Sequence, residues 1–214
     1  MSLIVEFIDS NVVIIAHEFN LSVINSIWLF KNNIFTEEEL QGRPSLPVFV
    51  EAQSKDFNFK IVPERLQFSI SPKCDNASHL ISSKVTKIIN ELPHTPYTAA
   101  GFNFTYHIFS KDTDIARLTQ SLFCQHDSKL FSDFNTDDAR FGGYFSKDII
   151  GVRLRLDAKP VTLQKQDKKE ERLQLAYNFH ITLSPQDDSS IILDFLEKWD
   201  KAKKIAQEIT SKLN

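Results

Sequence analysis

Two histidines have the type and the placement that could support chemistry. His17 and His107 each lie at the end of an apolar, β-branched segment that precedes a predicted helix. If these two segments are related by symmetry, the imidazoles could face each other near the axis and bind a metal ion or act as acid and base. The sequence alone does not show that a carboxylate would join the two imidazoles in one site, so we favour ordinary strand histidines and expect no metal and no cofactor.

The glycine pair that follows Arg140 is a second candidate site. Gly142 and Gly143 offer two adjacent backbone amides, which could bind an anion together with the Arg140 guanidinium. Paired glycines within a strand also produce a bulge or a close backbone approach. We favour this structural interpretation, and an enzyme or small-ligand site near Arg140, Gly142 and the strand histidines is an alternative.

Three basic residues could form a strip on one face of a strand. Arg153 and Arg155 alternate with apolar residues in a predicted strand, and Lys159 follows them. Such a strip could contact phosphates, so a nucleic-acid-binding module that uses the sheet face is another alternative. The formal net charge of -3 disfavours it, because nucleic-acid affinity comes largely from phosphate neutralisation. A cross-strand ladder of salt bridges is the explanation that we favour.

The signatures of several large enzyme classes are missing. The chain has no GxSxG, P-loop or GxGxxG string, and its five glycines leave little backbone to cradle a phosphate. The acidic loop 133–138 begins with the ligand spacing of a calcium loop. However, Asp138 replaces the essential glycine and Tyr144 replaces the bidentate glutamate. We therefore expect a solvated connector here, and the sequence favours a protein without catalytic activity.

Hydrophobic periodicity predicts the elements that would position these residues. Alternating or β-branched apolar runs predict strands, and apolar residues three and four apart predict helices. Ser22, Thr36, Asn76 and Asp112 are expected to begin helices, and Glu39 completes a capping box with Thr36. The predicted strands are 11–19, 47–52, 57–62, 66–71, 97–109, 140–146, 149–158 and 173–183.

The same order of elements is predicted twice, over residues 1–95 and 96–214. Each half has a strand, a helix, three strands and a helix, and an Ile-Ser-Pro or Leu-Ser-Pro string precedes the last helix of each. Neither half can comfortably bury its sheet alone. We therefore expect one α+β domain over 1–214, in which helices cover one face of an antiparallel sheet. In element order this arrangement resembles TATA-binding-protein-like saddle folds, and such a resemblance does not fix function.

Composition and charge are those of an ordinary globular protein. Apolar residues make up 42% and charged residues 25% of the 214 residues, which excludes disordered and fibrous classes. Charged residues interrupt the apolar segment 1–19, so it predicts neither a membrane span nor a signal peptide. Cys74 and Cys124 are expected to be free thiols. We expect a cytoplasmic protein that does not bind membranes.

The closing helix, 189–214, is the best candidate for contact outside the domain. Its apolar stripe is wide, and Trp199 lies among lysines at positions 198, 201, 203 and 204. Docking on the protein's own sheet is the default, but the outer end of such a helix could serve a partner or a second copy. Our leading hypothesis is a non-catalytic interaction or assembly subunit of a cytoplasmic complex, which binds a protein partner or forms a homo-oligomer.

Overall fold

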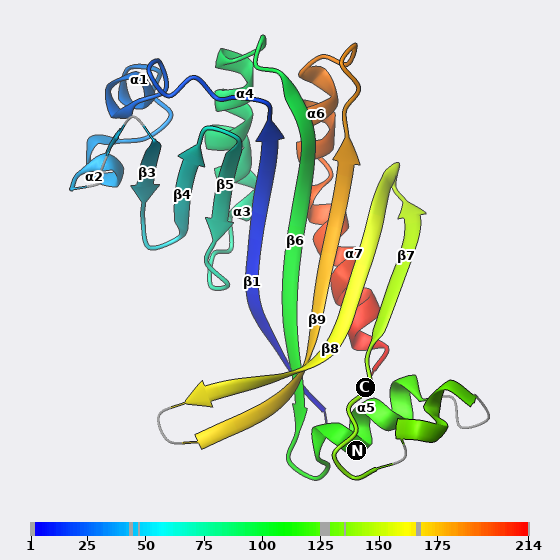
Figure 1. Ribbon diagram of the computed structural model, residues 1–214. Helices are drawn as coiled ribbons and strands as arrows, with labels where there is room; N and C mark the ends of the chain where they lie inside the picture. Colours follow the sequence, from blue (N-terminus) through cyan, green and yellow to red (C-terminus); the bar gives the residue numbers. More distant parts are fainter. Residues whose placement is uncertain are drawn as a thin grey trace.

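An antiparallel sheet of nine strands runs through the part of the chain that the structure describes. The structure is a computed structural model, and it describes residues 3–42, 45–46, 48–124, 129–134, 136–165 and 168–213. The strand order is β2-β3-β4-β5-β1-β6-β9-β8-β7 (Figure 1). The strands are β1 Leu3–Ala16, β2 Ser45–Leu46, β3 Phe49–Gln53, β4 Phe57–Val62, β5 Arg65–Ile70, β6 Tyr97–Ser110, β7 Gly143–Ile149, β8 Val152–Lys165 and β9 Lys168–Thr182.

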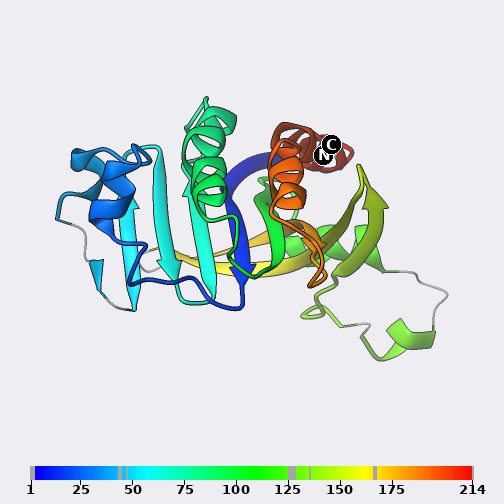
Figure 2. The ribbon, with the colours of Figure 1, turned by 90° about the horizontal axis from the view of Figure 1, so that it is seen from above.

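Helices cover one face of this sheet. The rods formed by α3, α4, α6 and α7 pack on the same side, and no described helix lies on the opposite face of β5, β1, β6 and β9 (Figure 2). We call this opposite face the open face. The predicted α+β class, with helices on one face of an antiparallel sheet, is confirmed. The helices are α1 Ser26–Lys31, α2 Glu37–Leu40, α3 Ala77–Leu80, η1 Ile81–Thr86, α4 Lys87–Glu91, α5 Ile115–Phe123, η2 Lys129–Phe134, α6 Ser190–Leu196 and α7 Trp199–Ser211.

The strands β1 and β6 form the centre of the sheet. They pair over their whole lengths, from Leu3 opposite Ser110 to Ala16 opposite Tyr97. In the first half the last of the four following strands, β5, lies beside β1, and in the second half the last of the three following strands, β9, lies beside β6. Apart from the two-residue β2, the two halves thus have the same strand order outward from the β1–β6 pair. An internal repeat of 1–95 and 96–214 stays a prediction.

Alternating hydrophobicity explains which side of each strand faces the helices. In β4, Phe57, Phe59 and Ile61 are buried, whereas Asn58 and Lys60 are exposed on the open face. Successive strand residues point to opposite faces, so this pattern commits the apolar side of β4 to the helices. The capping box at α2 is also as predicted. The Thr36 side chain accepts a hydrogen bond from the backbone N–H three residues on, and a carboxylate there accepts one from the backbone N–H of Thr36.

Both long predicted helices are interrupted. The closing helix is divided into α6 and α7 by Glu197 and Lys198. The helix predicted over 76–92 contains a π-helical segment, η1, which includes the buried Lys84. Hydrophobic spacing predicted both rods but not these breaks, because apolar residues three and four positions apart continue through each interruption.

Lys84 is the centre of a buried polar cluster between η1 and α2. Its ammonium group lies 2.7 and 2.9 Å from the two carboxylate oxygens of Glu39 and 3.2 Å from the carbonyl oxygen of Ile34. It also lies 4.6 Å from the ring centroid of Phe35 and 4.9 Å from that of Phe57. Every strong donor on this buried cation therefore has an acceptor or an aromatic face, which is how a buried charge is tolerated.

The strands β8 and β9 extend beyond the rest of the sheet as a two-stranded ribbon (Figure 1). Arg172 lies at the base of this ribbon, and its side chain is almost completely buried. It forms ion pairs with Glu6 of β1 and Glu170 of β9, and its guanidinium lies 4.4 Å from the ring centroid of Phe109. This cluster fastens the ribbon to the central strands.

Candidate functional site

The two histidines that a symmetric arrangement could have brought together lie at opposite ends of the sheet. The backbone N–H of His17, just after β1, donates to the carbonyl of Pro96, whereas His107 lies opposite Glu6 near the end of β6. Because β1 and β6 are antiparallel, the two histidines are about ten residues apart along the strands, or roughly 35 Å. The alternative of a shared histidine site, which the sequence left open but did not favour, is therefore wrong.

The two histidines that lie within strands, His107 of β6 and His180 of β9, are on the open face of the sheet. The Nε2 atom of His107 is 3.3 Å from Gln174 Oε1, and its Nδ1 atom has no hydrogen-bond partner among the described residues. Burial, and then the positive charges of Arg155 and Arg153, lower the pKa of His180. A lowered pKa keeps this imidazole neutral at pH 7, so His180 adds no positive charge to the open face.

Arg140 is held by an acidic residue of β9. Its Nη2 atom lies 3.1 Å from both carboxylate oxygens of Glu171. A Cβ atom on Gly142 would lie 2.5 Å from the backbone carbonyl oxygen of Ala158, so the two backbones approach each other too closely for any other residue. Gly143 begins β7. A close backbone approach therefore accounts for Gly142, and Glu171 already balances the charge that would attract an anion.

The predicted basic strip is largely neutralised. Arg153 Nη1 lies 3.1 Å from Asp148 Oδ1, and Lys159 Nζ lies 2.6 Å from Asp157 Oδ2. Arg155 has no ion pair among the described residues. All three basic residues are exposed on the open face, as alternation predicted. Two of the three side chains form salt bridges between neighbouring or nearby positions, which leaves little free positive charge for phosphates.

A row of carboxamides crosses the centre of the open face, and the sequence analysis missed it. Asn103 Nδ2 donates to Asn11 Oδ1 at 2.8 Å, and Asn178 Nδ2 donates to Asn103 Oδ1 at 2.9 Å. Ser69 of β5 and Arg155 of β8 continue the row on either side. These side chains satisfy one another, which explains how an uncovered sheet face is kept polar.

Trp199 cannot contact a partner directly. It is 1% exposed, and its ring lies 5.2 Å from that of Phe102 and 4.8 Å from that of Phe104. The small side chains of Ala202 and Ala206 allow α7 to lie close against the sheet on the same side. The indole belongs to the core between α7 and β6, so the expectation that Trp199 serves an external contact is wrong.

The strand β7 is an edge of the sheet, and its aromatic side chains are exposed. Tyr144 is 65% and Phe145 51% exposed, and β7 pairs only with β8 among the described strands. The turn between β7 and β8 has two residues, Ile150 and Gly151, both with positive φ, which is a type I′ turn. Such a turn fixes the register and the twist of the two strands, so β7 is held as a regular edge.

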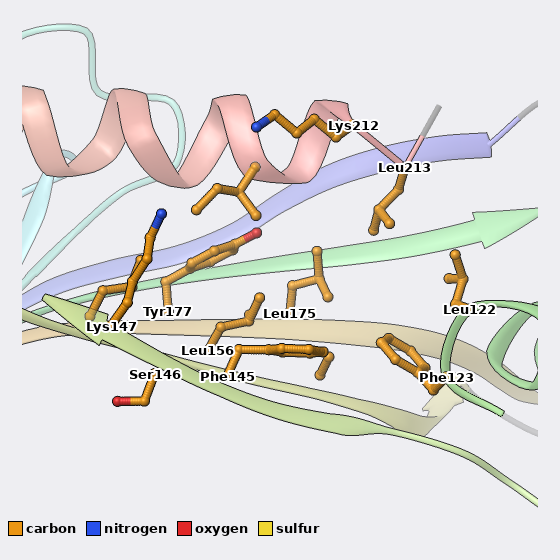
Figure 3. A pocket seen from close by; sticks show the side chains of 13 residues that line it. Leu122, Phe123, Phe145, Ser146, Lys147, Leu156, Leu175, Tyr177, Lys212 and Leu213 are labelled. Carbon is orange, nitrogen blue, oxygen red and sulfur yellow. The ribbon is translucent and has the colours of Figure 1, made fainter. Parts of the chain in front are cut away.

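An apolar groove of about 470 Å³ runs along the helix side of β7. Its walls come from β7, β8, β9, α5 and the end of α7 (Figure 3). We call this cavity and the unpaired side of β7 together the edge groove. Its size lies within the range of cavities that bind ligands or peptide side chains. The apolar side chains that line it include Leu122, Phe123, Phe145, Leu156, Leu175 and Leu213.

Two lysines border the edge groove from different walls. Lys147 lies on β7, at the end away from Leu122 and Phe123, and Lys212 lies on the helix wall, next to Leu213 (Figure 3). Both are exposed, and neither has an ion-pair partner among the described residues. Tyr177 on the floor of the groove is uncharged at neutral pH; burial raises the pKa of its hydroxyl further, to about 12, and this hydroxyl is hydrogen-bonded to Thr210. The groove therefore combines apolar walls with two exposed lysines on its borders.

Sequence reasoning predicted a strand near Tyr144 but not its place at the edge. The periodicity of a single strand does not reveal which strands flank it, so the strand predicted over 140–146 could not be assigned to the edge. The available signal was the short run Tyr144-Phe145-Ser146-Lys147-Asp148, in which two aromatic residues are followed by two charges. Charged residues on a strand are typical of sheet edges.

Neither the acidic connector 133–138 nor the metal-ligating side chains of the described residues form a further site. Asn135 lies outside the described residues, and β7 follows the connector. Within the described ranges, no group of three or more His, Cys, Asp or Glu side chains could hold a metal ion. Nor does any described helix have the length and apolar character to cross a membrane.

Comparison of the chain with models of protein families and with curated protein sequences gives no match.

Proposed function

We propose that this protein is a non-catalytic interaction subunit that joins a larger protein assembly through the edge groove. The observation that carries the proposal is the exposed edge of β7, where Phe145 lines an apolar cavity on the helix side and Tyr144 is exposed on the open face. An unpaired edge strand presents free backbone N–H and C=O groups, and natural proteins normally cover or disrupt such an edge. Here the edge is regular and aromatic, which is typical of a surface that another chain covers.

The energetics favour coverage of this surface. Phe145 has about half of its surface in water, roughly 100 Å², and burying it would contribute about 2.5 kcal/mol. The cavity behind it would accept an apolar side chain from a partner. Tyr144 would add an amphipathic ring of the kind that is enriched at interface hot spots. Lys147 and Lys212 favour a partner that brings negative charge or aromatic faces to the borders of the groove.

Photo-crosslinking in the native cell tests the proposal. A photoreactive phenylalanine replaces Phe145 in one variant and Phe30 in a matched control, because Phe30 is 50% exposed on α1, next to the other end of the sheet (Figure 1). We expect one dominant protein adduct from position 145 and none of the same mass from position 30. The proposal fails if position 145 gives no adduct, or if both positions give the same set.

A further inference from the structure

We propose that a second copy of this chain occupies the edge groove, and that the two β7 strands pair antiparallel about a two-fold axis at Ser146. This inference rests on the proposed function, since it identifies the partner of the same surface. The result is a dimer in which one sheet runs continuously through both copies. The argument begins with the direction of the backbone groups of β7.

The turn after β7 determines which of its backbone groups point outward. A two-residue type I′ turn is closed by a hydrogen-bonded pair, here Ile149 and Val152. Hydrogen-bonded and non-hydrogen-bonded pairs alternate along an antiparallel ladder. The N–H and C=O groups of Tyr144, Ser146 and Asp148 therefore point away from β8, toward the unpaired side.

Pairing about Ser146 uses all of these outward groups. It sets Ser146 against the partner's Ser146, and it sets Tyr144 against the partner's Asp148. Each such pair exchanges two N–H···O bonds, about six in all across the axis. If the axis moves by one pair toward either end of β7, one of the outward-pointing residues no longer has a residue of the partner's β7 opposite it. Ser146 is thus the centre that a two-fold pairing of this strand favours.

The side chains of β7 are self-complementary in this register. On the open face Tyr144 lies opposite the partner's Asp148, and on the groove side Phe145 lies opposite the partner's Lys147. No like charges are directly opposite each other, which a cross-strand pair would penalise. A lysine across from an aromatic ring also allows a cation–π contact. The charges that would otherwise protect an edge from pairing here match the aromatic residues of an identical strand.

The same pairing covers the exposed parts of the groove. The partner's Phe145 and Lys147 would form the missing outer wall beside Phe145 and Leu122, both of which are partly exposed. On the opposite side, Ser146 is the last member of the polar row that crosses the open face through Arg155 and Asn178. The Ser146–Ser146 pair would connect this row with the same row of the partner. The open face of the joined sheet would then stay polar, and its groove side would stay apolar.

Sedimentation of the full chain between about 1 and 200 μM, with one variant that targets the backbone of the edge, tests the dimer. Wild type is expected to reach twice the monomer mass as concentration rises. In Ser146→Pro the only N–H lost points outward, so β7–β8 pairing is retained. Loss of the central pair of bonds should weaken dimerisation about 30-fold. A wild-type chain that stays monomeric throughout, or a dimer that Ser146→Pro leaves unchanged, overturns the proposal.

Oxidative crosslinking provides a test that does not depend on how a proline is tolerated. Cα atoms in a hydrogen-bonded antiparallel pair are about 5.5 Å apart, within the range of disulfides. In a Cys124→Ser background, Ser146→Cys should form a disulfide-linked dimer at least tenfold faster than the control Ser22→Cys, which lies in an exposed turn before α1. Equal rates overturn the dimer. If the Phe145 photo-adduct instead contains a different protein, the dimer is refuted while the interaction function stands.

Discussion

Replacing Lys84 by Met should lower the free energy of unfolding by about 3 kcal/mol. The substitution keeps most of the aliphatic stem but removes the ammonium group from the Glu39 carboxylate, the Ile34 carbonyl and the rings of Phe35 and Phe57. Removing one partner of a buried ion pair typically costs 3–5 kcal/mol, because the other charge stays buried. The Glu39 side chain is 17% exposed, so water reaches it partly and we expect the lower end of that range.

A double-mutant cycle separates the ion pair from the packing of the lysine stem. Glu39→Gln alone should cost about 2 kcal/mol, since Gln at this position can still complete the capping box. The double variant Lys84→Met with Glu39→Gln leaves no uncompensated charge, so it should also cost about 2 kcal/mol, well below the sum of the singles. Lys87→Met is the matched control, because this neighbouring lysine bonds only an exposed carbonyl, and it should change stability by less than about 0.5 kcal/mol.

Urea denaturation followed by circular dichroism measures all four variants against wild type. A loss below about 1 kcal/mol for Lys84→Met would show that the cluster contributes little. Strict additivity of the two single changes would refute the assigned ion pair, since independent sites show no coupling. A changed slope with denaturant, rather than a changed midpoint, would indicate a different unfolded state and not a weaker fold.

Three further changes test other parts of the structure. Trp199→Ala should destabilise by about 4 kcal/mol in urea melts, as expected for a core aromatic residue; a change near zero would contradict its burial. Gly142→Ala should cost about 2 kcal/mol, measured as a lower melting temperature, because its methyl group would press on the backbone of Ala158; an unchanged melting temperature would disprove the close approach. The lowered pKa of His180 means that the unfolded chain binds a proton more readily, so stability should fall as pH drops below about 6.5. Arg155→Gln should raise that pKa in an NMR titration, and an unmoved or lower value would exclude Arg155 as a cause.

The sequence predicted several elements whose structure local chemistry decides, although α1 begins after Asn25 and not at Ser22, and α5 after Asp114 and not at Asp112. Phe57, Phe59 and Ile61 alternate with polar residues and do form a half-buried strand. Thr36 and Glu39 have the spacing of a capping box and form one. These features depend on residues two to four positions apart, so a single sequence contains all the information that they require.

Features that depend on distant neighbours were missed or wrong. Trp199 belongs to an inward stripe, but the lysines around it suggested an outer role, and only the position of α7 against β6 decides between them. His17 and His107 have similar local settings, yet the antiparallel register of β1 and β6 separates them. The edge position of Phe145 follows from strand order, which is set by pairing across the whole sheet and not by periodicity within β7.

The central place of β1 has a consequence for how the chain acquires its structure. One side of β1 pairs with β5, but its other side has no neighbour until β6 arrives. Roughly eighty residues separate Ala16 from Tyr97, the nearest of the residues that pair between these strands, so closing this contact carries a large entropic cost. A nascent chain of which only the first half has been synthesised would therefore expose the unpaired edge of β1. Whether this edge aggregates would depend on how quickly the ribosome synthesises β6, which covers it.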